Sequence, residues 1–173
     1  MQIPIEKQIM GIDGEHRIII AGFGGQGVLT LGKLLCKAAM REGRETTYVP
    51  AYGTEVRGGT ANCHVVISDG PIFSPRVERA DSLVILNQLS WERFAERLRP
   101  DGMLVLNSSL VTPPSPQEAG LSKGHMVLLP ATERAANLGN VVVANMIMLG
   151  GFRAATDICS RENLLEALAE SGR

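Results

Sequence analysis

The fold is decided by the stretch His16-Arg-Ile-Ile-Ile-Ala-Gly-Phe-Gly-Gly-Gln-Gly27 and by the helical pattern that follows it. Residues 16–21 form a short, β-branched run bounded by glycine, which is typical of a buried parallel strand. From Val28 to Arg41 the apolar residues recur at helical spacing, and Gly43 follows where a helix would end. The sequence therefore predicts a strand, a glycine-rich loop and a helix in immediate succession.

The rest of the chain continues the alternation of strands and helices. Asp69-Gly70 is a hairpin turn signal that would return residues 71–74 antiparallel to the strand before it. Because alternating strands and helices connect by right-handed crossovers, the predicted fold class is α/β: a Rossmann-like, mostly parallel sheet with helices on both faces and a β-hairpin insertion. Further strands are predicted at 45–49, 62–68, 82–86, 102–106 and 126–130, and further helices at 90–98, 131–138, 141–155 and 161–171.

One domain is expected. The chain has 173 residues, about the length of one domain, and no repeat or long linker divides it. We assign residues 16–173 to a single Rossmann-like domain and residues 1–15 to a leader whose order the sequence leaves open. In such sheets ligands bind at the carboxyl ends of the strands, which is where the glycine loop lies.

Charge and composition exclude several functional classes. With 17 Lys+Arg against 18 Asp+Glu the net charge is −1, and the interspersed charges argue against binding to nucleic acid or to a membrane surface. The most apolar stretch, 141–152, is well short of the ~20 residues that span a bilayer. The first residues lack the apolar region and cleavage site of a secretory signal. We therefore expect a soluble, cytoplasmic protein.

The sequence lacks catalytic and metal-binding motifs. Cys36, Cys63 and Cys159 are odd in number and far apart, which argues against a disulfide framework, a zinc site or a redox centre. The histidines are similarly scattered, and no GxSxG, HExxH, paired-carboxylate or P-loop motif is present. The sequence predicts no catalytic residue and no metal ligand, and therefore a chain that does not catalyse alone.

The glycine loop is the first candidate site. Its place between a strand and a helix aims backbone N–H groups and the helix dipole at one point, which suits a phosphate or pyrophosphate. The alternative is that the glycines only permit tight packing of strand on helix. The candidate residues are Gly22, Gly24, Gly25, Gln26 and Gly27.

A dinucleotide site would also need an acidic residue after the second strand, to hold the ribose hydroxyls. That position reads Val49-Pro-Ala-Tyr-Gly53 without an acid, and Glu55 already lies inside the next loop. NAD binding is therefore the less favoured alternative. Gln26 adds an amide donor and acceptor, which would either orient a ligand or tie one loop to another.

A second polar loop follows the second strand. If its backbone is extended, Glu55 and Arg57 point the same way, and the glycines beside them let a partner approach the main chain. Arg57 would then grip a carboxylate or phosphate, pair across a subunit boundary, or pair with Glu55. The candidate residues of this ligand or subunit-interface loop are Tyr52, Gly53, Glu55, Arg57, Gly58 and Gly59.

Three asparagines near the same edge are weaker candidates. Asn87 and Asn107 follow two predicted core strands. Each would either face a ligand or cap the helix that follows, which for Asn87 is the helix that contains Trp91. Asn145 lies in an apolar helical run and is expected to be a hydrogen-bonded core amide or a helix-contact residue.

Together the two loops identify a family resemblance. The segment Ile-Ala-Gly-Phe-Gly-Gly-Gln-Gly-Val-Leu at 20–29, followed by Tyr-Gly-Thr-Glu-Val-Arg-Gly-Gly-Thr-Ala-Asn-Cys at 52–63, resembles the gamma subunit of the 2-oxoacid:ferredoxin (2-ketoacid:acceptor) oxidoreductases. The second loop is most similar to that of the 2-oxoglutarate type. Thr54 departs from the proline that the family often carries there, which affects the expected loop conformation.

The resemblance implies an oxidoreductase complex that decarboxylates a 2-oxoacid, transfers the acyl group to coenzyme A and reduces ferredoxin. It implies that this chain holds no cofactor alone: thiamine diphosphate, Mg²⁺ and [4Fe-4S] clusters would sit on alpha, beta and, where present, delta partner subunits. Coenzyme A would be a co-substrate, and the glycine loop would hold one of its phosphates. An isolated gamma chain is expected to self-associate through the apolar surface that its partners would cover.

Overall fold

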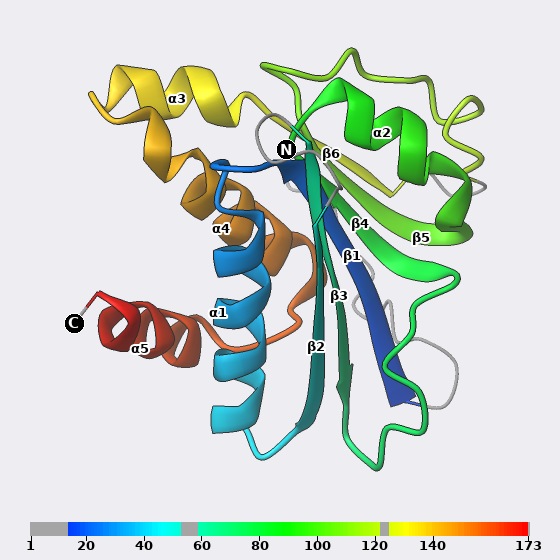
Figure 1. The fold of residues 1–173 in the computed structure, drawn as a ribbon, viewed down its shortest axis with the longest axis vertical. Coiled ribbons are helices and arrows are strands. Elements are labelled where there is room, and N and C mark those ends of the chain that lie inside the picture. Colours follow the sequence, from blue (N-terminus) through cyan, green and yellow to red (C-terminus); the bar gives the residue numbers. More distant parts are fainter. Residues whose placement is uncertain (1–13, 53–58, 122–124, 173) are drawn as a thin grey trace, which may run out of the picture.

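The computed structural model describes residues 14–52, 59–121 and 125–172. Six strands form one sheet in the order β2-β3-β1-β4-β5-β6 (Figure 1). The strands are β1 (Glu15–Phe23), β2 (Glu45–Tyr52), β3 (Thr60–Ser68), β4 (Ala80–Ile85), β5 (Leu98–Asn107) and β6 (Met126–Leu129). The helices are α1 (Val28–Arg41), α2 (Gln88–Phe94), α3 (Ala131–Asn137), α4 (Ala144–Thr156) and α5 (Arg161–Ser171), with single 3₁₀ turns at η2 (Ala95–Arg97) and η3 (Val141–Val143).

The sheet is parallel on one side of β1 and antiparallel on the other. β1 pairs in parallel with β4, β4 with β5, and β5 with β6, as expected of strands joined by helical crossovers. β3 runs antiparallel to both β1 and β2. The α/β class is therefore confirmed, with a mixed sheet in which β3 separates the first two strands.

The hairpin lies in a different place from the one predicted. It is formed by β2 and β3, which pair from Glu45 with Ser68 to Tyr52 with Ala61. Residues 71–74 form no strand. The prediction fails because β3 is already hydrogen-bonded on both edges, by β1 and β2, and has no free edge to offer a returning strand.

β2 also runs further than the sequence indicates. Pro50 was expected to end it, yet Pro50 lies inside the strand opposite Cys63. The proline is tolerated because β2 is the edge of the sheet, where a backbone position need not donate to a neighbouring strand. The extension carries the strand to Tyr52 and brings the start of the second loop to the same edge as the glycine loop.

Helices cover both faces of the sheet (Figure 1). Ile18 and Ile20 of β1 face a core with α1, α4 and the inner residue Ala167 of α5, whereas Ile19 faces a second core with α2. Consecutive strand residues point to opposite faces, so the unbroken isoleucine run serves both cores. No helix among the described residues is long and apolar enough to cross a lipid bilayer.

Helix α1 approaches the sheet closely at Gly32. A Cβ at this position would lie 2.6 Å from Cys63 Sγ and 3.0 Å from Tyr48 Cε2, so nothing larger than hydrogen fits without displacement. Gly150 on α4 is also helical, but a Cβ there would meet no heavy atom within 4 Å.

We predict that Gly32→Val lowers the free energy of unfolding by about 2 kcal/mol, because overpacking outweighs the gain in helix propensity. The matched control Gly150→Ala should raise it by up to about 1 kcal/mol. Urea unfolding followed by circular dichroism measures both. A Gly32→Val midpoint equal to wild type would contradict the close approach.

Candidate functional site

The glycine loop joins β1 to α1 at the carboxyl edge of the parallel strands. Gly25 and Gly27 have φ values of 92° and 75°, in the left-handed region that glycine adopts without cost. Gly27 is the N-cap of α1, and no side chain caps it. The first amides of α1 therefore point outward without a side-chain acceptor, and they leave the positive end of the helix dipole open.

Gln26 holds the loop in shape from within. Its Oε1 accepts hydrogen bonds from Phe23 N at 2.7 Å and from Asn87 Nδ2 at 3.1 Å. Its Nε2 donates to the carbonyl oxygen of Leu86 at 3.5 Å. Of the two roles considered for Gln26, the structure shows the one that ties the loop to the end of β4.

The loop glycines divide into two pairs. A Cβ on Gly22 would lie 2.7 Å from Gln26 Oε1 and 2.8 Å from Val28 Cγ2, and one on Gly27 would lie 2.0 Å from Asn145 Nδ2. These two are required for packing. A Cβ on Gly24 or Gly25 would meet nothing within 4 Å, and both residues are exposed. The packing interpretation therefore holds for Gly22 and Gly27, whereas ligand binding stays a prediction for Gly24 and Gly25.

The surface of the described residues has a hollow of about 760 Å³ and another of about 610 Å³. The hollow of 610 Å³ is a pocket at the glycine loop. One wall is the loop with the first turn of α1, and the other is η3 with the start of α4. Glycine and aliphatic side chains dominate the lining, with the α1 amides supplying polarity. The lining residues are Phe23, Gly24, Gly25, Gly27, Val28, Leu29, Thr30, Ala61, Val142, Val143, Asn145 and Met146.

The far wall of this pocket was not predicted from sequence. Val142 is 71% exposed at its rim, and Asn145 reaches Gly27 with Nδ2 3.5 Å from the glycine carbonyl oxygen. The expectation that Asn145 is a helix-contact residue is confirmed. Nothing in the local pattern of 141–155 distinguishes a pocket wall from an ordinary amphipathic segment, because Gly27 and Asn145 are 118 positions apart and no spacing signal joins them.

The second loop lies mostly outside the described residues, which include the backbone of Tyr52 and all of Gly59. Gly53, Glu55, Arg57 and Gly58 are among those left undescribed. Gly59 accepts a hydrogen bond through its carbonyl oxygen from Gly24 N at 3.3 Å. The two candidate loops therefore meet through their main chains at this edge. The roles expected of Glu55 and Arg57 stay predictions.

Asn87 and Asn107 serve the turns that follow β4 and β5. Asn87 Oδ1 accepts a hydrogen bond from Ser90 N at 2.9 Å. Asn87 is therefore confirmed as the expected N-cap of α2, the helix that contains Trp91. Asn107 Oδ1 accepts from Ala131 N at 3.1 Å, which places it at the start of α3. Both side chains hold the loops around the site, and the Oδ1 atom of each already accepts a hydrogen bond from a backbone amide.

The cysteines are buried and chemically quiet. Burial is the main cause that raises the pKa of Cys36 to about 11, of Cys63 to about 12 and of Cys159 to about 11. Among the described residues no group of three or more His, Cys, Asp or Glu side chains is placed to hold a metal ion. The described part of the chain thus has a pocket at the glycine loop and no reactive thiolate.

Comparison with known proteins identifies the family of this chain. The family model described as pyruvate ferredoxin/flavodoxin oxidoreductase matches residues 17–173. The chain belongs to this family. The matched residues include both candidate loops and, apart from the first two residues of β1, all of the helices and strands described above.

The relatives are subunits of 2-oxoacid oxidoreductases. The ketoisovalerate oxidoreductase subunit VorA of Methanothermobacter thermautotrophicus is 44% identical over 138 residues, which cover 79% of this chain and 27% of VorA. The 2-oxoglutarate synthase subunit KorC of Methanocaldococcus jannaschii is 33% identical over 156 residues, which cover 89% of this chain and 82% of KorC. The chain thus spans about a quarter of VorA and most of KorC.

Solved structures share the fold. The gamma subunit of a keto/oxoacid ferredoxin oxidoreductase from Geobacter sulfurreducens has a TM-score of 0.75 and 29% identity, covering 90% of this chain and 83% of that one. The 2-oxoglutarate:ferredoxin oxidoreductase of Magnetococcus marinus has a TM-score of 0.82 at 22% identity, covering 91% of this chain and 27% of that one. At that identity the second likeness supports the fold alone.

We predict that Gly27→Ala destabilises the chain by about 2 kcal/mol or more, since it adds left-handed strain to the contact with Asn145. Gly24→Ala, with open space and no positive φ, should change the free energy of unfolding by less than about 0.5 kcal/mol. Thermal unfolding measures both. The double variant Gly27→Ala, Asn145→Ala should recover only part of the loss, because the backbone strain persists; full recovery would show that the clash alone matters.

The thiols should resist labelling while the chain is folded. With pKa values of about 11 to 12, the thiolate fraction at pH 8 is on the order of 0.1% or less, and the side chains are buried as well. We expect Ellman's reagent to label all three cysteines within minutes in 8 M urea, as counted by intact mass, and none over the same time in buffer. Rapid labelling of the native chain would contradict this arrangement.

Proposed function

We propose that this chain is the gamma subunit of a 2-oxoglutarate:ferredoxin oxidoreductase. The complex would convert 2-oxoglutarate and coenzyme A to succinyl-CoA and carbon dioxide, and the two electrons released would reduce two one-electron ferredoxin acceptors. The chain would complete the complex without supplying a catalytic residue. The observation that carries the proposal is family membership together with a pocket whose polar wall is the uncapped start of α1.

The choice of substrate rests on the likeness to KorC as well as on the sequence of the second loop. KorC is 33% identical to this chain and is matched over 82% of its own length. The matching part of VorA is 27% of a longer protein, although its identity is higher at 44%. The second loop has the form that resembles the 2-oxoglutarate type. Ketoisovalerate is the competing substrate, and the assay below includes it.

Coenzyme A fits the glycine-loop pocket by its chemistry. The exposed backbone of Gly24 and Gly25 and the first amides of α1 would donate to a phosphate, since a helix amino terminus favours an anion. The aliphatic rim at Val142 and Met146 would contact the uncharged part of the ligand. A pocket of about 610 Å³ is within the usual size range for such ligands.

The remaining cofactors of the proposed complex would belong to partner subunits. The described cysteines are buried on α1, on β3 and in the turn between α4 and α5, and they are no set of ligands for an iron–sulfur cluster. Thiamine diphosphate, Mg²⁺ and the clusters are therefore assigned to alpha, beta and, where present, delta chains. Those chains are the proposed partners, the cytoplasm is the proposed compartment, and ferredoxin is the proposed acceptor.

The first test is the native mass of the chain in anaerobic extract from its own cells. We expect it to co-migrate with thiamine-dependent viologen reduction that requires both coenzyme A and 2-oxoglutarate. Higher activity with ketoisovalerate would reassign the substrate. A lone chain or homodimer without this activity would overturn the proposal, and an NAD(H)-dependent change of Trp91 fluorescence would then favour a dinucleotide-binding oxidoreductase.

We predict that Gly24→Asp raises the KM for coenzyme A about tenfold or more, because a carboxylate placed at an exposed loop position repels the phosphate. Gly24→Asn has the same shape without the charge and should change this KM by less than about threefold. The KM for the 2-oxoacid and the mass of the complex should stay constant in both. Equal coenzyme A kinetics in the two variants would show that the loop is scaffold only.

A further inference from the structure

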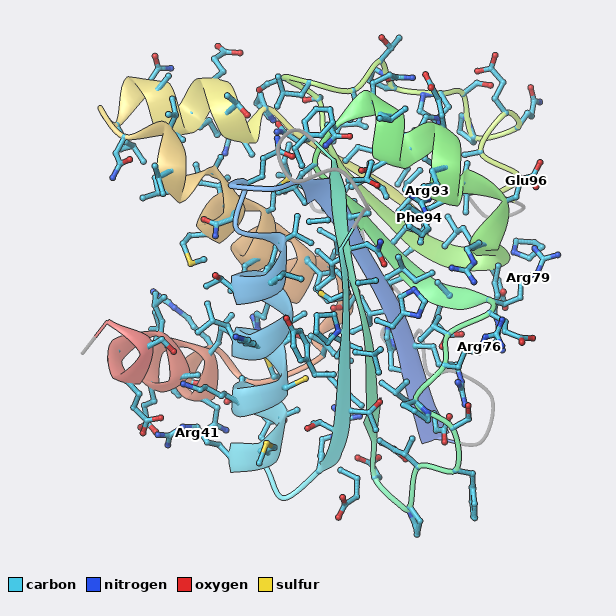
Figure 2. All side chains as sticks on the ribbon, viewed as in Figure 1. Arg41, Arg76, Arg79, Arg93, Phe94 and Glu96 are labelled. Atoms are coloured by element: carbon cyan, nitrogen blue, oxygen red, sulfur yellow. The ribbon has the colours of Figure 1, made fainter. Side chains whose placement is uncertain are left out.

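Four arginines border the outer part of the sheet on the side of α2: Arg76, Arg79, Arg93 and Arg97, here called the arginine flank (Figure 2 labels three of them). Arg93 donates from Nη1 to Thr60 Oγ1 of β3 at 2.8 Å, so its flank of α2 faces β3. Arg97 lies four residues on and shares that flank. Both guanidinium groups also lie near the ring of Phe94, at 5.6 and 5.9 Å from its centroid.

The edge strand β2, beyond the buried strand β3, keeps an exposed face on the side of the arginine flank. Helix α2 packs over β1 and β4, one strand short of β3. Tyr48 of β2 packs toward α1, so its neighbour Val49 points to the α2 side, where it is 40% exposed. An isolated sheet face with exposed aliphatic and cationic side chains is suited to covering by another chain.

The charges of the arginine flank are poorly compensated within the described residues. Arg79, Arg93 and Arg97 make no ion pair with a described carboxylate; Arg79 donates only to the carbonyl oxygen of Glu96, at 2.7 Å. Arg76 lies 3.7 Å from Glu78, and both side chains are 75% exposed, so this pair is weak. By contrast, Arg41 on the opposite face of the sheet contacts both Glu166 and Glu170 of α5.

The carboxylates of α2 do not neutralise this flank. Glu92 accepts from Gln88 Nε2 at 3.1 Å, and Gln88 in turn accepts from Thr112 N at 3.0 Å. This chain of contacts places Glu92 on the side of α2 that faces Thr112, away from β3. The helix thus separates its charges, with arginine toward the open sheet face.

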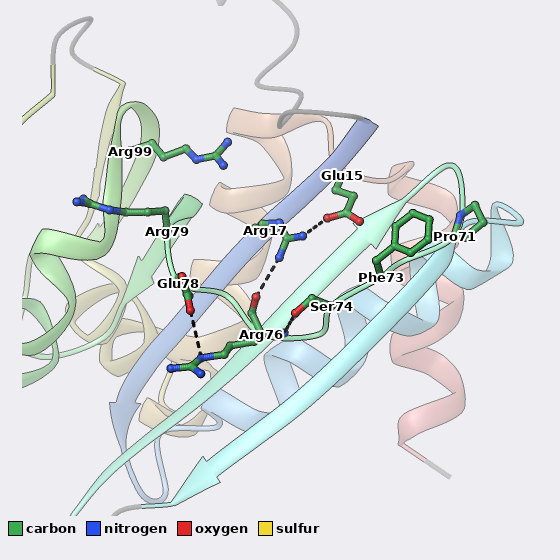
Figure 3. Close-up of a pocket in the computed structure, with 9 residues that line it drawn as sticks. All are labelled: Glu15, Arg17, Pro71, Phe73, Ser74, Arg76, Glu78, Arg79 and Arg99. Atoms are coloured by element: carbon green, nitrogen blue, oxygen red, sulfur yellow. Dashed lines mark hydrogen bonds and ion pairs between the residues drawn. The ribbon is translucent and has the colours of Figure 1, made fainter.

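The arginine flank continues into a hollow of about 760 Å³ at the amino end of β1 (Figure 3). Arg17 and Arg99 also line it, but they are held by Glu15 and Asp81. Phe73 lines the same hollow and is 94% exposed. An exposed aromatic ring beside Arg79, which pairs with no described carboxylate, and the weakly paired Arg76 is the kind of surface that anchors a protein partner.

His64 of β3 shows that the arginines share one electrostatic field. Burial, then the charges of Arg97 and Arg76, lowers its pKa. Two arginines from different segments therefore act on the same side chain between them. The positive potential at His64 therefore comes from more than one arginine.

The grouping of these arginines favours a partner with several negative charges. Arg79 donates to the carbonyl oxygen of Glu96, the neighbour of Arg97, while Arg97 and Arg76 both act on His64. A single phosphate would meet only part of such a group, whereas an acidic segment brings several carboxylates to it.

We propose that the arginine flank and the exposed face of the neighbouring edge strand β2 dock an acidic segment of another subunit of the complex, with Phe73 as its apolar contact. The segment carries several Asp or Glu side chains that meet the arginines of the flank. The inference rests on the proposed function for the existence of that subunit. It is separate from the glycine-loop pocket, which opens on the α1 side of the sheet.

The test compares two charge-reversed double variants of the full chain in the assembled complex. Arg93→Glu, Arg97→Glu alters the arginine flank, and Arg134→Glu, Arg161→Glu makes the same charge change at exposed residues of α3 and α5. Binding of each chain to the remaining purified subunits is measured between 50 and 400 mM NaCl. Arg93→Gln, Arg97→Gln removes the charges with less disturbance, and circular dichroism confirms that each variant is folded.

We expect the flank reversal to weaken binding at least tenfold at low salt, and the Gln variant to weaken it about threefold or more with a smaller salt dependence. The control should bind like wild type. If the wild-type chain assembles and the flank variants bind equally well, this inference fails while the proposed function stands. If the wild-type chain does not assemble, the proposed function fails.

The inference also has a test that needs no partner subunit. A fluorescent hexaglutamate peptide should bind the wild-type chain in a salt-dependent way, and at least tenfold more weakly to the Arg93→Glu, Arg97→Glu variant. Pyrophosphate serves as the small-anion probe. Peptide binding that is unchanged by the reversal would overturn the acidic-segment assignment, and so would pyrophosphate binding that is lost with the reversal while the peptide does not bind.

Discussion

The junction between β1 and α1 is the constraint on which the rest of the site depends. Gly22 and Gly27 leave no room for a Cβ, and Gln26 closes the loop by accepting from Phe23 and Asn87. These contacts join β1, α1, β4 and α4 at one point. A side chain on either glycine would separate the strand from the helix and displace the amides that line the pocket.

Rigidity and openness are divided between neighbouring glycines of one loop. The buried pair fixes the backbone, while Gly24 and Gly25 face open space. The hydrogen bond from Gly24 to Gly59 then joins this loop to the start of β3. On one side β1 pairs antiparallel with β3, and on the other side it pairs parallel with β4. The hairpin of β2 and β3 therefore places a second loop beside the glycine loop, at an edge where an all-parallel sheet would carry another crossover.

The two faces of the sheet carry different chemistry. On the α1 side, the pocket combines uncapped amides with an aliphatic wall and belongs to a small ligand in our proposal. On the α2 side, the arginines lie near the exposed edge strand β2 and suit an acidic segment in our proposal. In these two proposals the subunit binds a co-substrate and a partner chain at once, because the sheet separates the two surfaces.

The sequence by itself determined the elements and the family. Helices α1 and α5 have the predicted bounds, because strong periodicity and clear end signals act locally. The two loops identified the family through their residues. Tertiary structure alone decided that 71–74 is no strand, that Pro50 stays within β2, which glycines pack and which are open, and that Asn145 contacts Gly27. These features depend on which edges and surfaces come together in space, and no local spacing records such contacts.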